Sequence, residues 1–193
     1  MRLATAADAP ALVDLIRAAY RGPASYERWT SEEHLVRGTR TDERAVLAAI
    51  EPPGTEMLVV GDDAADLPIA CCRVADRGDG LASFGMFAVD PARQGGGTGR
   101  RVVGLAERAA AELFGARTLE LEVLGQQGQL RSWYERLGFR ATGETRPFPA
   151  DPVFAVPMRD DLYLVVLTKR LPDGDRDGAD RRMRPARAAG SGQ

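Results

Sequence analysis

The stretch VDPARQGGGTGRR, residues 89–101, joins an apolar, strand-like segment to a strongly helical one. Glycine occupies positions 95, 96, 97 and 99 of this stretch, and arginine follows at positions 100 and 101. Each glycine loses more conformational freedom on folding than any other residue, which costs roughly 0.5–1 kcal/mol relative to alanine. The stretch therefore indicates either a sharp turn or a place where the backbone comes very close to another group.

A helix that begins at about Gly97 or Thr98 presents unpaired backbone N–H groups and the positive end of its dipole to this stretch. Because glycine has no Cβ, a phosphate can approach those N–H groups closely, and Arg100 adds positive charge at the same place. The stretch has no lysine, which a P-loop requires, and it lacks the last glycine of the dinucleotide pattern G-x-G-x-x-G. It therefore predicts an anion-binding loop of a different kind.

The composition is typical of a globular chain with one core: 193 residues, 44% hydrophobic and 28% charged, with a formal net charge of −2. This balance predicts no broad basic surface for nucleic acid. The two cysteines, Cys71 and Cys72, are neighbours and are expected to be buried and reduced. With His34 as the single histidine they cannot form a zinc site, so no metal is predicted. The sequence contains no signal-like segment and no apolar run that could cross a membrane, which predicts a cytoplasmic protein.

Hydrophobic periodicity predicts a single domain over residues 1–171. Helices are expected over 5–20 and 41–50, with another between Trp29 and Arg40, and strands over 56–61, 67–76 and 81–89. After the glycine stretch the pattern predicts a helix that ends at Gly115, then a strand over 118–124, a helix over 129–138, and strands over 139–145 and 162–171. This order predicts an α+β fold with a central sheet flanked by helices. Residues 172–193 show no periodicity and are expected to form a disordered tail.

Two segments follow each other at a characteristic separation. The first has the pattern V-x-P-x-x-Q-G-x-G-x-G over residues 89–99. The second, LELEVLGQQGQLRSWYERLGF over residues 119–139, combines an L-x-V strand with a helix that ends in Tyr-x-x-x-Gly-Phe. Together these segments resemble the GNAT superfamily of N-acetyltransferases that use acetyl-coenzyme A (acetyl-CoA). The resemblance implies an α/β/α layered fold whose mixed, mostly antiparallel central sheet has about seven strands.

The resemblance also implies a function, the transfer of an acetyl group from acetyl-CoA to a primary amine. In this family the first segment follows the fourth strand, and its backbone amides bind the pyrophosphate of the coenzyme. Carried over to this sequence, the coenzyme-binding residues are Phe87, Ala88, Val89, Gln94, Gly95, Gly96, Gly97, Thr98, Gly99, Arg100 and Gln127. Gln127 occurs where many members have asparagine, which leaves that contact open.

The reaction needs a neutral amine, and an alkyl ammonium with a pKa of ~10.4 is about 3.4 units from that state at pH 7, a cost of roughly 4.6 kcal/mol. Strand alternation places Glu120 and Glu122 on one face of the strand 118–124. Glu122 lies in the Leu-Glu-Val context that holds a general base in members similar to ribosomal-protein acetyltransferases. We therefore predict Glu122 as the base and Tyr134 as the general acid for the leaving thiolate. The alternatives are that the carboxylates simply face solvent, that a water chain is the base, and that Tyr134 only packs against the sheet.

Three aromatic residues, Tyr26, Trp29 and Phe148, occur in segments that flank the acceptor groove in this family. With Glu120 they are the candidate acceptor-binding residues, although such aromatic residues also commonly cover a core. The acceptor itself stays open between a small molecule and a protein N-terminus, and so does the acyl-chain preference. A homodimer is compatible with the sheet-edge pairing common in the family. A second hypothesis is an acyl-CoA-binding regulatory domain that has lost turnover.

Overall fold

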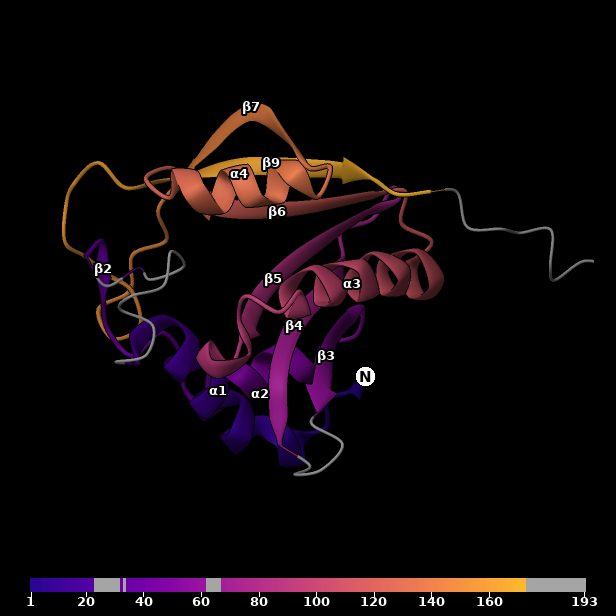
Figure 1. Cartoon of the computed structure of the whole chain (residues 1–193), viewed down its shortest axis with the longest axis horizontal. Helices are drawn as coiled ribbons and strands as arrows, with labels where there is room; N and C mark the ends of the chain where they lie inside the picture. Colours follow the sequence, from indigo (N-terminus) through magenta and orange to yellow (C-terminus); the bar gives the residue numbers. More distant parts are fainter. Residues whose placement is uncertain (23–31, 33, 62–66, 173–193) are drawn as a thin grey trace, which may run out of the picture.

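The computed structural model describes residues 1–22, 32, 34–61 and 67–172, so the expected tail lies almost entirely outside the described residues. Its centre is a seven-stranded sheet in the order β1-β3-β4-β5-β6-β9-β7 (Figure 1). The strands are β1 (Arg2–Leu3), β3 (Thr55–Gly61), β4 (Pro68–Asp76), β5 (Leu81–Val89), β6 (Thr118–Leu124), β7 (Arg140–Pro147) and β9 (Tyr163–Arg170). Every neighbouring pair is antiparallel except β5 and β6, which confirms the expected mixed sheet.

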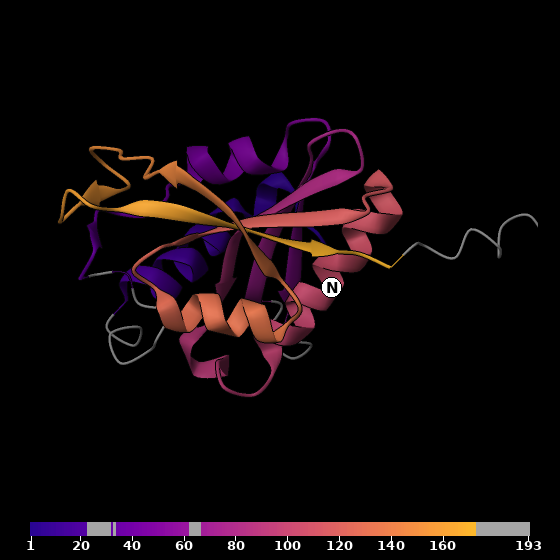
Figure 2. The same ribbon diagram turned by 90° about the horizontal axis from the view of Figure 1, so that it is seen from above.

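Helices cover both faces of this sheet. The four α-helices are α1 (Ala9–Arg21), α2 (Glu43–Ile50), α3 (Thr98–Phe114) and α4 (Gly128–Arg136), and the single-turn 3₁₀ helices are η1 (Ala6–Asp8) and η3 (Pro91–Arg93). Helices α1 and α2 lie on one face, while α3 and α4 lie on the other (Figure 2). The fold is therefore the three-layered α+β arrangement that the sequence predicts.

The N-terminal end of the first helical segment is held by a carboxylate. Asp8 accepts hydrogen bonds from the Thr5 backbone N–H at 2.7 Å and from the two terminal nitrogens of Arg2 at 2.7 and 2.6 Å. The hydrogen bond from Arg2 is the main reason that the pKa of the Asp8 carboxyl lies below its ordinary value. Helix α2 begins in the same manner, since the Asp42 carboxylate accepts from the Ala45 N–H at 2.7 Å.

The prediction of a helix between Trp29 and Arg40 is wrong for residues 32 and 34–40, the part of that segment that the structure describes. Residues Val36–Arg37 instead form the short strand β2, which pairs antiparallel with β8 (Val156–Pro157), a strand that the sequence did not predict. Leu35 and Val36 are buried in a small core cluster with Leu124 and Leu162. Packing partners distant in the sequence therefore decide this conformation, and a local pattern cannot show them.

Side chains of β4 alternate between two cores. Cys71 packs with the residues of α1 and α2, whereas Cys72 and Val74 pack with those of α3 and α4. Both cysteines are buried and free, as expected. Burial raises the pKa of the Cys71 thiol to about 12 and that of Cys72 further still.

The functional part of the fold is the place where β5 and β6 separate. These parallel strands pair only over three positions, from Leu81 opposite Thr118 to Ser83 opposite Glu120, and then diverge (Figure 1). On its other edge β5 carries a β-bulge, where the register against β4 shifts and Met86 adopts a positive φ of 41°. The divergence leaves one edge of β5 without a neighbouring strand from residue 84 to residue 89.

Candidate functional site

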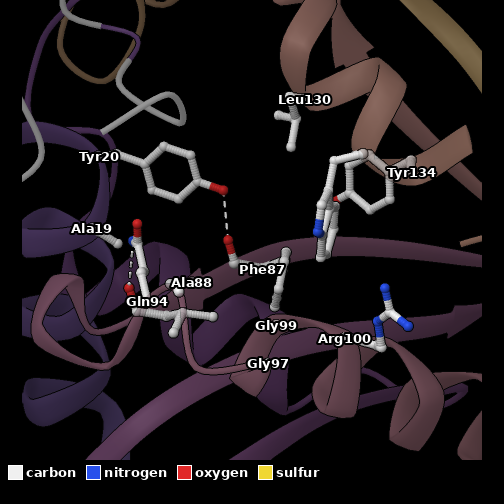
Figure 3. Close-up of a pocket in the computed structure, with 13 residues that line it drawn as sticks. Ala19, Tyr20, Phe87, Ala88, Gln94, Gly97, Gly99, Arg100, Leu130 and Tyr134 are labelled. Carbon is white, nitrogen blue, oxygen red and sulfur yellow. Dashed lines mark hydrogen bonds between the residues drawn. The ribbon is translucent and has the colours of Figure 1, made fainter. Parts of the chain in front are cut away.

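A cavity of about 290 Å³ lies along this edge of β5 and reaches the start of α3. Its walls come from α1, β5, the glycine loop and α4, as Figure 3 shows. The lining residues are Ala19, Tyr20, Phe87, Ala88, Val89, Gln94, Gly95, Gly97, Gly99, Arg100, Leu130, Trp133 and Tyr134. We call this the first cavity. It brings together most of the residues that the sequence assigned to coenzyme binding; Gly96 in the loop and Thr98 at the start of α3 do not line it.

The loop between β5 and α3 has the properties of an anion site. Gly95 and Gly97 have φ values of 89° and 85°, which glycine adopts without strain. A Cβ added at Gly95, Gly96 or Gly97 would meet no atom within 4 Å, so open space surrounds the loop. Gly97 is the N-cap of α3, no side chain caps this helix, and its first turn contains no acidic residue. The first N–H groups of a 17-residue helix are thus available to a phosphate, and Arg100 is exposed beside them.

Two side chains fix the carbonyl groups on the free edge of β5. The Tyr20 hydroxyl donates to the Phe87 carbonyl at 2.5 Å, and the Gln94 side-chain amide donates to the Val89 carbonyl at 3.1 Å (Figure 3). Gln94, predicted to bind the coenzyme, lines the first cavity, and its amide nitrogen connects the loop to the end of the strand. These bonds hold the edge of β5 in a fixed shape.

Tyr134 lies at the end of the first cavity, on α4. Its ring packs against Phe84, Trp133 and Phe139 at centroid distances of 6.4, 4.9 and 5.6 Å. Burial is the main reason that the pKa of the Tyr134 phenol lies well above its ordinary value, with a smaller contribution from nearby Tyr20. The phenol therefore keeps its proton at neutral pH and is a hydrogen-bond donor at this position.

A second cavity, also of about 290 Å³, lies against the first. The two cavities share four lining residues, Tyr20, Phe87, Leu130 and Tyr134. The sheet face between β4 and β7 contributes most of the remaining wall of the second cavity, and much of that wall is charged. Phe148 and Leu124 supply part of its apolar surface.

The two glutamates of β6 line the second cavity next to each other. Arg146 on β7 donates through Nη1 to Glu120 at 3.0 Å and to Glu122 in a short contact, and through Nε to Glu144 at 2.7 Å. These hydrogen bonds raise the pKa of Arg146, the bond to Glu120 having the largest effect, so its guanidinium stays charged. Glu122 is thus part of an ion-pair cluster at the cavity wall.

The structure distributes the other predicted residues unevenly. Gln127, predicted to contact the coenzyme, lines the second cavity and not the first. Phe148, predicted to bind the acceptor, also lines the second cavity. Tyr26 and Trp29 lie outside the described residues. Tyr20 lines both cavities but was missed, because in the sequence it is one apolar position of an amphipathic helix.

Neither a metal-binding cluster nor a membrane-spanning helix occurs within the described ranges 1–22, 32, 34–61 and 67–172. In these ranges no group of three or more histidine, cysteine or acidic side chains is arranged to hold a metal ion. No helix among these same residues is both long and apolar enough to cross a membrane.

Comparisons with known proteins agree with this geometry. Residues 53–141 match the family model described as an acetyltransferase (GNAT) domain, and a search of curated proteins finds no match. The chain is similar to the ribosomal-protein-S18-alanine N-acetyltransferase of Escherichia coli, at 17% identity over 91% of this chain and 96% of that one, with a TM-score of 0.63. It is similar to the spermidine/spermine N-acetyltransferase of Vibrio cholerae at 15% identity over 95% of each chain, with a TM-score of 0.58. It is also similar to a Streptococcus mutans protein, at 14% identity over 89% of this chain and 98% of that one, with a TM-score of 0.65. At these identities the structural likeness establishes the fold alone.

Proposed function

Because residues 53–141 match the acetyltransferase (GNAT) domain model, we propose that the protein transfers an acetyl group from acetyl-CoA to a primary amine. The observation that carries this proposal is the meeting of two cavities at Tyr134. The first begins at a loop suited to a diphosphate, and the second has a polar wall suited to an amine. A cytoplasmic location belongs to the same proposal.

In this proposal acetyl-CoA occupies the first cavity. Its pyrophosphate accepts hydrogen bonds from the backbone N–H groups between Gly95 and Arg100, where the open loop leaves room for it. Its amide-containing arm extends along the edge of β5 from Val89 toward Phe87, in the manner of an added strand. This direction brings the thioester to Tyr134.

The reaction then needs two proton transfers. The amine nitrogen attacks the thioester carbonyl, a C–N bond forms, the C–S bond breaks, and the leaving sulfur takes a proton from the Tyr134 hydroxyl. The amine loses its own proton to a base, which is Glu122 or a water held at its carboxylate. The net products are the acetylated amine and the free coenzyme thiol, and Tyr134 regains its proton from solvent.

The direct test measures free thiol released from acetyl-CoA during incubation of the protein with a broad panel of primary amines. Acetyl-CoA binding is measured separately by calorimetry. We expect saturable binding and amine-dependent thiol release. Binding without thiol release for any amine would favour the alternative, a regulatory acyl-CoA-binding domain. Absence of binding would overturn both.

A pair of neighbouring arginines tests where the diphosphate binds. Arg100 lines the first cavity, whereas Arg101 does not, and both side chains belong to exposed residues in the first turn of α3. We expect Arg100→Gln to weaken acetyl-CoA binding about 3- to 10-fold, the value of roughly one charge–phosphate contact near the surface. Arg101→Gln is the matched control and should stay within about twofold of the wild type. Equal effects would indicate only a general influence of charge.

A further inference from the structure

The charged residues of the second cavity form two different walls. On one side, β6 and β7 present Glu120, Glu122 and Arg146, which together have an excess of negative charge. On the other side, β4 and the turn after it present Arg73 and Arg77. The cavity is therefore bipolar, with an acidic wall and a basic wall across the sheet face.

The charge of Arg73 is not compensated by any described residue. Its Nε is buried and has no hydrogen-bond partner, and its guanidinium forms no ion pair with any residue that the structure describes. Glu32 and Arg40 also line the cavity, but they carry opposite charges that attract each other. Arg73 pairs with Gly85 across the β4–β5 ladder, and its Nη2 lies 3.7 Å from the position that a Cβ on Gly85 would take. The lack of a side chain at residue 85 thus keeps space open beside a guanidinium.

Ser83 adds a second donor between the two walls, since on β5 it pairs with Ala75 of β4 on one side and with Glu120 of β6 on the other. It lies two residues before Gly85 on β5, and because strand side chains alternate it shares the face that Arg73 occupies. Its Oγ is buried and, among the described residues, has no hydrogen-bond partner. Buried polar groups are normally paired, so two unpaired donors lining one cavity indicate groups that a ligand satisfies.

We propose that Arg73 and Ser83 bind an oxyanion, a carboxylate or a phosphonate, on the amine acceptor. A guanidinium and a hydroxyl are the donors that such a group prefers, and the acidic wall of Glu120 and Glu122 suits the ammonium at its other end. The acceptor class is thus a small amine that also carries an anionic group. This inference rests on the proposed function and specifies its substrate.

The spacing of the strand limits the length of this acceptor. Gly85, next to the Arg73 guanidinium, precedes Phe87 by two residues, which is at most about 7 Å because the β-bulge at Met86 lies between them. Phe87 lines both cavities at the point where the amine must meet the thioester. The anionic group therefore lies only a few bonds from the reacting nitrogen.

The test compares acceptors that differ only in the anionic group. Thiol release is measured for β-alanine against ethylamine, for γ-aminobutyrate against propylamine, and for 3-aminopropylphosphonate as the phosphonate arm. We expect kcat/KM to be at least 10-fold higher for the anionic member of each pair. A preference for either the carboxylate or the phosphonate at equal chain length identifies which oxyanion the site takes.

Variants then assign the preference to named residues. Arg73→Gln should lower kcat/KM for the anionic acceptors about 10- to 100-fold, as expected for loss of a charge-assisted hydrogen bond, and leave the alkylamines nearly unchanged. Ser83→Ala should lower kcat/KM severalfold for the anionic acceptors alone. Arg73→Lys should retain part of the kcat/KM that Arg73→Gln loses. Arg170→Gln, an exposed arginine at the end of β9, is the control. Acetyl-CoA affinity and the melting temperature should not change in Ser83→Ala.

Two different failures can be told apart. If no amine releases thiol, the proposed function fails. If alkylamines or polyamines react as well as their anionic counterparts, or if Arg73→Gln and Ser83→Ala slow every acceptor equally, the oxyanion site is refuted while the acetyltransferase activity stands.

Discussion

Removal of one oxygen atom from Tyr134, the buried tyrosine of α4, should lower turnover and leave acetyl-CoA binding nearly unchanged. In Tyr134→Phe the ring keeps its contacts with Phe84, Trp133 and Phe139, which lie 4.9 to 6.4 Å away between centroids. The hydroxyl forms no hydrogen bond with the residues that the structure describes, so its removal should change the free energy of unfolding by less than about 1 kcal/mol. The substitution therefore tests the proton of this hydroxyl and little else.

The expected effect on the reaction is large. Loss of a positioned general acid typically lowers a rate by about 10²- to 10⁴-fold, which corresponds to roughly 2.7–5.4 kcal/mol of activation free energy. Because the phenol lies beyond the loop that we propose as the diphosphate site, the dissociation constant of acetyl-CoA should stay within about threefold of the wild type. The measurements are thiol release at saturating acetyl-CoA, calorimetric binding, and thermal unfolding.

Tyr163→Phe is the matched control. Tyr163 is 41% exposed on β9 and lines neither cavity, so its hydroxyl should not affect turnover. A Tyr134→Phe variant that keeps more than a tenth of the wild-type turnover refutes the acid role. A variant that loses acetyl-CoA affinity in proportion to its activity shows instead that Tyr134 acts in binding.

Gly97→Ala should lower the free energy of unfolding by roughly 1–2 kcal/mol and weaken acetyl-CoA binding, because the φ of 85° at this position strains an L-residue. Gly96→Ala lacks that strain, so its thermal unfolding should match that of the wild type. Cys71 and Cys72 should not react with a thiol reagent at pH 8 until the protein is denatured, because both are buried and burial raises both pKa values. Rapid labelling of the native protein would contradict the burial of these thiols. Asp8→Asn should destabilise the protein by up to about 1 kcal/mol at neutral pH. Since the folded-state pKa of Asp8 is lowered, the difference in unfolding free energy between the wild type and Asp8→Asn should narrow progressively below about pH 4. A difference that stays constant down to pH 3 in denaturant titrations would contradict a stabilising role of the Asp8 carboxylate.

Most elements could be predicted from the sequence because their signals are local. The glycine loop, the N-cap of α2 at Asp42 and the end of α3 at Gly115 each depend on a few neighbouring residues. The alternation of polar and apolar residues in β6 likewise places Glu120 and Glu122 on the face opposite the buried Leu119 and Leu121. The helix wrongly predicted between Trp29 and Arg40 lies where the two-residue strand β2 depends on β8, a partner more than a hundred residues away.

The sequence by itself determined most of the helices and strands, apart from β2 and β8, and the open loop at the start of α3, since periodicity and glycine placement act over short stretches of chain. Only the tertiary structure decided that Tyr20, Phe87 and Tyr134 meet where two cavities join, and that Arg73 faces a charged wall formed by β6 and β7. The physical reason is that these side chains come from separate elements, and their positions follow from the register of the strands and from the separation of β5 from β6. Register is set by pairing and packing over the whole sheet, so no local pattern specifies it.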